Sequence, residues 1–389
     1  MKQTKRGLLV AMCLFGLVAC KKELAPSSSE TEGADLSSKA IQSGGNGAKA
    51  RYGHVYTLSN QPGGNNVLAY SRAADGTLTY EAAYSTGGTG TGGGLGNQGA
   101  LILTQDGGEL LAVNPGSNTV SSFKINGSGL KLKSTVNSNG IRPVSVTQHG
   151  HLVFVLNAGG TGSISGFTLG ENDKLTPIHN STRLLSSTMA GAAQISFVNE
   201  GKVLAITEKA TNKIITYTVN GSGIPGSMHS ITSANQTPFG FAVGVNQKIY
   251  VSEAAGGAPG ASTLSSYSIN NNGAISLANG PVGAGQSAAC WVVLTKNNLY
   301  AYTTNTASDN LSAFSVNASS GNLGLLQAIA ATSGSGPIDA ALDSNSDFLY
   351  VLNSGSHSIS TFRVANNGNL SSVQTLPGVP AGATGLAAN

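Results

Sequence analysis

The stretch Asp347-Phe-Leu-Tyr-Val-Leu-Asn353, followed by Ser-Gly-Ser-His and Ile359-Ser-Thr-Phe362, contains the pattern that decides the fold. A short apolar strand ends at a polar residue, a turn of small residues follows, and a second strand ends at an aromatic residue. The same pattern recurs at 298–314 and at 202–217. Aligning all copies gives seven repeats, and a repeat of this length indicates one supersecondary unit per copy.

Two columns of the alignment define the repeat. The polar position, which we call the anchor, is occupied in order by Asn60, Asn114, Asn157, Glu208, Glu253, Asn305 and Asn353. The aromatic position is occupied by Tyr70, Phe123, Phe167, Tyr217, Tyr267, Phe314 and Phe362. Another strand precedes each anchor strand and a fourth follows the aromatic position. Each copy therefore has about four strands in roughly 40–50 residues, the size of a propeller blade.

The expected fold is an all-β, seven-bladed β-propeller over residues 52–389, with an open β-solenoid as the alternative. Segment 382–388 resembles the strand that precedes an anchor, but no anchor strand follows it. Segment 54–60 is an anchor strand without a preceding partner. Pairing of these N- and C-terminal strands would complete one blade, close the ring and remove two sheet edges, which favours the propeller.

Composition limits the class of partner. The chain has 389 residues, 53 of them Gly, and only 10% are charged, which argues against coiled coils and charge-driven disorder. The formal charge is +4, and Lys2, Lys5 and Arg6 supply three of these charges. The remaining sequence has no strong field for a polyanion, so we expect no nucleic-acid partner.

The N-terminal segment predicts export. Residues 1–19 combine a basic start with a short apolar run and are interpreted as a lipoprotein signal peptide. Leu17-Val18-Ala19-Cys20 resembles the bacterial lipobox, which predicts lipidation of Cys20; an ordinary signal peptide with an incidental Cys is the alternative. Residues 20–51 are interpreted as a flexible tether. We therefore expect a cell-envelope protein whose only membrane contact is its lipid anchor, at the outer membrane, on the periplasmic face or at the cell surface.

The repeats resemble the lactonase family of seven-bladed propellers, which includes 6-phosphogluconolactonase-type enzymes and 3-carboxymuconate cyclase-like proteins. The Leu349-Tyr-Val-Leu-Asn353 line is of the family's Tyr-Val-x-Asn type, and the resemblance covers about 53–389. It implies a propeller fold and, for an active member, hydrolysis of a small sugar-acid lactone at the mouth of the central channel.

The chain departs from the family at one line. Family enzymes have Gly-Pro-Arg-His-x-x-Phe on an inner strand, whereas the matching segment 191–197 has Ala193 and Gln194 at the Arg and His positions. This departure removes the expected anion clamp and the acid/base partner. Arg142, at an equivalent inner-strand start one blade earlier, is a candidate to supply a cation instead.

Two anchor residues are the main catalytic candidates. Glu208 and Glu253 replace Asn in consecutive repeats, and paired carboxylates near a channel could act as general bases or bind a divalent cation. The alternative is that both cap strand ends and bond to backbone amides or to Lys209. Arg142, Gln194 and Asp339 are the candidate substrate-binding residues. Each has a structural alternative, which is an inter-blade ion pair for Arg142 and buried hydrogen bonding for Gln194 and Asp339.

The other motifs give weak signals. No dedicated metal site and no cofactor are expected, apart from the cation alternative, because the histidines are scattered. Trp291, the only Trp, is either a core residue or a stacking surface for a sugar. The Gly-rich stretch 87–99 lacks the Gly-Lys-Ser/Thr of a phosphate loop and is interpreted as a flexible connection.

Two functions therefore stay open. One is a lipid-anchored lactonase-like hydrolase, with Glu208 and Glu253 as bases and Arg142 holding a small lactone or sugar acid. The other is a non-catalytic extracytoplasmic propeller that binds a protein or a glycan, which the missing Arg-His pair favours.

Overall fold

The computed structural model describes residues 51–127 and 129–389. The predicted signal peptide (1–19), the lipidation of Cys20 and nearly all of the predicted tether (20–51) lie outside the described residues. Within the described part of the chain, strands make up almost all of the regular structure, with one short 3₁₀ helix, η1 (Ala255–Gly257). No helix in these two segments is long and apolar enough to cross a membrane.

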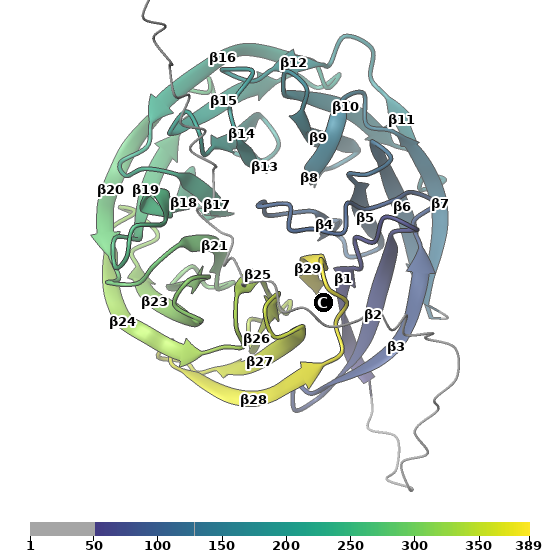
Figure 1. Ribbon diagram of the computed structural model, residues 1–389. Coiled ribbons are helices and arrows are strands. Elements are labelled where there is room, and N and C mark those ends of the chain that lie inside the picture. The colour runs from purple at the N-terminus through teal and green to yellow at the C-terminus, as the bar shows by residue number, and fades with distance from the viewer. Residues whose placement is uncertain (1–50, 128) are drawn as a thin grey trace, which may run out of the picture.

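Seven antiparallel sheets are arranged around a central hub, which confirms the predicted propeller (Figure 1). We number them as blades 1 to 7 and give their strands from the hub outward. Blade 1 consists of β29 (Thr384–Ala388), β1 (Arg51–Leu58), β2 (Asn66–Ala73) and β3 (Leu78–Ser85). Blade 2 consists of β4 (Leu101–Leu103), β5 (Glu109–Asn114), β6 (Thr119–Asn126) and β7 (Gly129–Asn137). Blade 3 consists of β8 (Ile141–His149), β9 (Leu152–Gly159), β10 (Ser163–Leu169) and β11 (Leu175–Pro177), and β12 (Arg183–Leu184) also pairs with β10.

The other four blades follow the same order. Blade 4 consists of β13 (Ala192–Val198), β14 (Val203–Glu208), β15 (Lys213–Val219) and β16 (Pro225–Thr232). Blade 5 consists of β17 (Pro238–Val243), β18 (Lys248–Glu253), β19 (Thr263–Ile269) and β20 (Ile275–Gly283). Blade 6 consists of β21 (Ala289–Leu294), β22 (Tyr300–Asn305), β23 (Asn310–Val316) and β24 (Leu323–Thr332). Blade 7 consists of β25 (Pro337–Leu342), β26 (Phe348–Asn353), β27 (Ser358–Val364) and β28 (Leu370–Pro377).

The ring closes through blade 1, as the sequence predicts. Strand β29 pairs antiparallel with β1, and Leu386 lies opposite Thr57. The Thr57 hydroxyl donates a hydrogen bond of 2.6 Å to the Gly385 carbonyl, and the His54 amide donates one of 2.6 Å to Asn389 Oδ1. Burial of Leu386 adds about 1.5–3 kcal/mol to this closure.

The two repeat columns form the interior of the blades. All seven aromatic positions are buried, and the apolar clusters draw residues from neighbouring sheets. All seven anchors are fully buried as well. Asn353 Nδ2, for example, donates to Ser358 Oγ at 3.2 Å and to Ser360 Oγ at 2.9 Å on the next strand. Asn114 makes the equivalent bond to Ser121 Oγ at 2.8 Å, so the repeated polar residue joins the second strand of a blade to the third.

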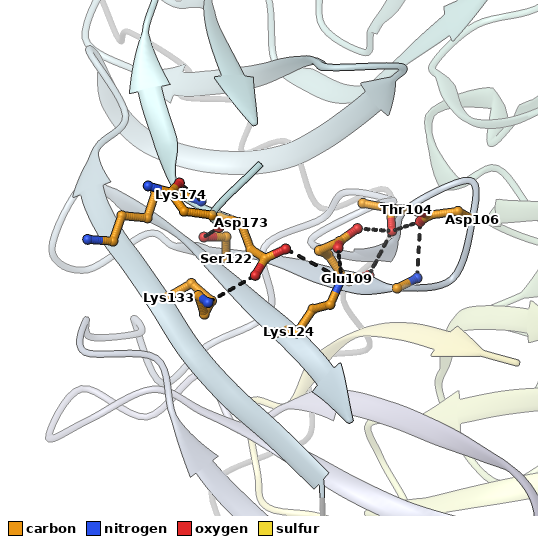
Figure 2. Close-up of polar contacts among 10 residues, drawn as sticks. Thr104, Asp106, Glu109, Ser122, Lys124, Lys133, Asp173 and Lys174 are labelled. Carbon is orange, nitrogen blue, oxygen red and sulfur yellow. Dashed lines mark hydrogen bonds and ion pairs between the residues drawn. The ribbon is translucent and has the colours of Figure 1, made fainter. Parts of the chain in front are cut away.

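A polar network joins blades 2 and 3 near their outer edges (Figure 2). Lys124 pairs with Glu109 of its own blade and lies 3.4 Å from a carboxylate oxygen of Asp173 in blade 3. Lys133 reaches the other oxygen of Asp173 at 3.0 Å, and the Ser122 hydroxyl donates to the Asp173 carbonyl at 2.7 Å. The network therefore contributes to contact between the sheets and lies away from the hub.

Candidate functional site

A Gly-rich segment, residues 86–100, enters the hub between β3 and β4 (Figure 1). Within this segment the Gln98 amide donates to the Ala193 carbonyl of β13 at 3.1 Å, and Gln98 Nε2 donates to the Val292 carbonyl of β21 at 2.9 Å. Trp291 Nε1 donates to the Asn97 carbonyl at 2.7 Å. The segment, which we call the hub plug, thus crosses from blade 2 to blades 4 and 6. The sequence-based expectation of a flexible connection here is wrong, because these bonds hold its backbone.

The packing around the hub plug requires a glycine on the neighbouring inner strand β17. A Cβ at Gly240 of β17 would lie 2.1 Å from Gln98 Oε1 and 2.7 Å from the Cys290 carbonyl oxygen. Only glycine leaves room there for the plug to reach blade 6. This contact explains part of the small-residue content of the inner strands.

Above the plug lies a cavity of about 340 Å³, which we call the hub cavity. It opens on the face where inner strands begin and second strands end. Its lining comes from the plug and from six blades: Gly94, Leu95, Gly96, Arg142, Ala158, Gly191, Ala192, Lys209, Thr237, Phe239, Trp291, Ile338 and Thr384. Its volume is at the small end of the range for ligand pockets, which suits one sugar unit.

Two cations face this cavity. Arg142 is the second residue of β8 and has a left-handed backbone (φ 55°), and Asn118 Oδ1 accepts its amide proton at 2.7 Å. Lys209 directly follows the anchor Glu208; its Nζ lies 4.6 Å from the centre of the Phe239 ring and donates to the Gly96 carbonyl. Burial, and then the charge of Arg142, lowers the pKa of Lys209 to about 8. Across residues 51–127 and 129–389, no carboxylate forms an ion pair with either cation.

The structure thus places Arg142 where the sequence predicted it and adds Lys209, which sequence reasoning considered only as a partner of Glu208. Phe239 and Trp291 form the apolar side of the cavity, with ring centres 5.0 Å apart. Trp291 is buried, which confirms its interpretation as a core residue. It also lines the cavity, and stacking of a sugar on its ring stays a prediction.

Glu208 and Glu253 do not converge on the cavity. Glu208 is fully buried and accepts bonds from the Ser186 amide at 2.9 Å and the Thr211 hydroxyl at 2.5 Å. Glu253 is also fully buried, and its carboxylate accepts hydrogen bonds from Ser233, Asn235, Thr263, Ser265 and Tyr267. Both occupy the structural position of the anchor Asn, with hydroxyl donors around them. The geometry therefore matches the strand-capping alternative, and neither carboxylate can serve as a base in the hub cavity.

Gln194 and Asp339 lie in the channel wall and not on the hub cavity. Gln194 Nε2 donates to the Phe241 carbonyl at 2.9 Å, and the Phe241 amide donates back to Gln194 Oε1 at 2.6 Å, which joins blades 4 and 5. Asp339 is buried at blade 7, and this burial raises the pKa of its carboxyl well above the usual value, against opposing bonds from backbone amides. Their contacts are structural, as the alternative interpretation of each predicted.

No group of three or more His, Cys, Asp or Glu side chains in the described segments could hold a metal ion. The two carboxylates offered as cation ligands are each enclosed by donor groups of their own blade, so they do not fit a shared divalent cation.

Comparisons with known proteins agree with this architecture. The sequence model described as "Lactonase, 7-bladed beta-propeller" matches residues 262–385. The resemblance to lactonase-family propellers is confirmed. A candidate 6-phosphogluconolactonase from Bacteroides uniformis is 17% identical, with a TM-score of 0.71 over 87% of this chain and 99% of that one. The periplasmic gluconolactonase PpgL of Pseudomonas aeruginosa is 16% identical, with a TM-score of 0.65 over 86% and 99%. None of the curated proteins matches this sequence.

At these identities the solved structures establish the fold of this lactonase-like propeller and leave its chemistry to its own residues. The segment matched by the family model contains Trp291 and Ile338 of the hub cavity, whereas both cations lie before it.

Proposed function

We propose that this lactonase-like propeller binds a small sugar acid, or the lactone of one, in the hub cavity. The observation that carries the proposal is the pair of cations, Arg142 and Lys209, which face a pocket of single-sugar size without a carboxylate partner. A guanidinium pairs well with a carboxylate, and the ammonium adds a second positive charge. Phe239 and Trp291 supply an apolar face for the carbon backbone of the ligand.

Calorimetric titration of the purified full chain with D-gluconate, at pH 7, tests this proposal. Lys209→Met and Arg142→Met should each weaken binding at least 10-fold, because each removes one charge from the pocket. Lys174→Met is the matched control, since this lysine is exposed on blade 3 and does not line the cavity. The proposal is wrong if gluconate does not bind at millimolar concentration, or if Lys209→Met and Lys174→Met bind it equally.

Opening of the lactone is a second candidate function, and the lowered pKa of Lys209 favours it. With a pKa of about 8, a useful fraction of the amine is neutral near physiological pH and can accept a proton from water. The resulting hydroxide adds to the lactone carbonyl, the Arg142 guanidinium stabilises the oxyanion, and the ring C–O bond breaks. The leaving alkoxide then takes the proton from Lys209, which gives the hydroxy acid.

Proton release from D-glucono-1,5-lactone and from its 6-phosphate, measured above the spontaneous rate, tests this reaction. Activity should increase as the pH passes about 8 and should disappear in Lys209→Met. The folded fraction of the Glu208→Gln variant should retain activity, because Glu208 does not line the cavity. Binding of gluconate without turnover would leave the binding proposal standing and overturn the hydrolase.

We also propose that the protein is a lipoprotein of the cell envelope. The support is the sequence of residues 1–20, above all the Leu17-Val18-Ala19-Cys20 motif. Labelling with a radioactive fatty acid should mark the wild type but not Cys20→Ser, and that variant should leave the membrane fraction. Digestion of intact cells with protease would distinguish display on the surface from a periplasmic position.

A further inference from the structure

A second hollow, of about 740 Å³, lies on the face opposite the hub cavity. It is formed where the hairpins between inner and second strands turn, in blades 2 to 5, and it has no lining residue in common with the hub cavity. We call it the hairpin groove. Its side-chain amides are Gln105, Gln148, Asn199, Asn246, Gln247 and Asn271.

The groove is neutral, in contrast to the hub cavity. Glu200 and Lys202 are its only carboxylate and ammonium, and they pair with each other at 3.7 Å. Side-chain amides dominate the rest of its polar lining. An amide presents both donors and an acceptor, as a sugar hydroxyl does, whereas a charged ligand would find no counter-charge here.

Two of the amides have unused hydrogen-bonding capacity. The side chains of Gln247 and Asn271 are exposed and make no hydrogen bond to any other residue that the structure describes. Each can therefore offer two donors and an acceptor to a ligand. Asn199, by contrast, donates from Nδ2 to the Ile269 carbonyl at 2.6 Å, and its Oδ1 is enclosed.

The floor of the groove is fixed before any ligand arrives. Gln148 Oε1 accepts the Gln105 amide proton at 3.0 Å, and Gln105 Nε2 lies 2.9 Å from His149 Nδ1. The His149 ring in turn packs against Phe197, with centres 5.9 Å apart. These contacts fix the rings of His149 and Phe197 in the lining of the groove. Because these side chains are already ordered, they lose little conformational entropy when a ligand binds.

We propose that the hairpin groove binds a neutral oligosaccharide of a few sugar units. The volume of the groove is about twice that of the hub cavity. The charges of Glu200 and Lys202 cancel, so these two residues give the lining no net charge. The free amides match the donor and acceptor pattern of sugar hydroxyls. This site is independent of the hub: it concerns another face, other residues and a ligand of different charge.

Titration of the full chain with cellotetraose, maltotetraose and chitotetraose, followed by calorimetry, tests the proposal. At least one should bind, and the double variant Gln247→Ala, Asn271→Ala should weaken that binding at least 10-fold. The control is Asn345→Ala, an exposed amide at the equivalent hairpin of blade 7, which should bind as the wild type does. Thermal unfolding of each variant checks that the fold is intact.

The outcomes separate this proposal from the function of the hub. Lys209→Met should leave oligosaccharide binding unchanged, and the double variant should leave gluconate binding unchanged. If none of the three tetrasaccharides binds, or if the double variant and Asn345→Ala bind equally well, the groove is not an oligosaccharide site. Competition between gluconate and the tetrasaccharide would also overturn the proposal, since it would place both in one cavity.

Discussion

Replacement of Glu253 by Gln is the sharpest test of the structural role assigned to the anchor carboxylates. Oε2 of Glu253 accepts bonds from the hydroxyls of Thr263 at 2.6 Å and Ser265 at 2.7 Å. Oε1 accepts bonds from Ser233 at 2.8 Å and Tyr267 at 3.0 Å. Burial, then the Glu253 charge, raises the pKa of Tyr267 far above its usual value, so the phenol stays protonated and able to donate.

The expected magnitude follows from two weakened bonds. Gln keeps one carbonyl oxygen, and its NH₂ group can donate to the hydroxyls of Thr263 and Ser265, as the Asn353 amide does to Ser358 and Ser360, so two hydrogen bonds lose their charged acceptor. Bonds to a charged group contribute about 1.5–3 kcal/mol each and neutral bonds about 0.5–1.5 kcal/mol, so each exchange costs about 1 kcal/mol. We expect the free energy of unfolding to decrease by about 2 kcal/mol. With an unfolding entropy of about 2.1 cal/mol/K per residue, Tm should decrease by about 3 °C.

Calorimetric unfolding of the wild type and of Glu253→Gln measures this change directly, and Glu171→Gln is the control at an exposed turn. Gluconate binding by the folded Glu253→Gln variant should match that of the wild type. If Glu253→Gln unfolds within 1 °C of the wild type and loses ligand binding or turnover, the carboxylate belongs to the functional site and the structural assignment is wrong.

Three further predictions concern the hub and the closure of the ring. The folded protein lowers the pKa of Lys209 to about 8, so the unfolded chain binds this proton more tightly. The free energy of unfolding should therefore increase between pH 8 and 10. Urea titrations should show this increment in the wild type but not in Lys209→Met. Gly240→Ala places a Cβ against Gln98 of the plug and should cost about 1–3 kcal/mol, whereas Gly93→Ala, in open space, should change Tm by less than 1 °C. Deletion of residues 384–389 removes β29 and should make the chain sensitive to limited proteolysis; a truncated protein as resistant as the full chain would contradict closure by this strand.

Most of the fold could be predicted from the sequence because each blade repeats the same local requirements. The buried anchor needs partners on the next strand, and the aromatic residue fills the space between sheets, so both columns persist along the chain. The hub plug could not be predicted in this way. Its conformation depends on Ala193, Trp291 and Val292, which lie about 95 to 195 positions further along the chain. The glycines of the plug are not spaced at a regular interval, so they give no repeat signal.

The candidate site was predicted only in part, for a related reason. The position of Arg142 follows from the repeat, since inner strands begin at the mouth of the hub. The same reasoning placed Glu208 and Glu253 in a channel, although an anchor side chain points into its own blade. The signal for Lys209 was present: it is the residue after an anchor, at the end of a second strand, where the chain passes the hub mouth.

The pairing of β29 with β1 has a consequence for the order of assembly. Strand β1 is synthesised long before β29, so a growing chain exposes the edge of β1 and has an incomplete sheet until residues 384–388 have been made. Translation must pass these residues before the seven blades can become cooperative as a whole. A frameshift or nonsense mutation just before codon 384 would therefore yield an edge-exposed product, prone to pair with a second copy, although nearly every blade was already encoded.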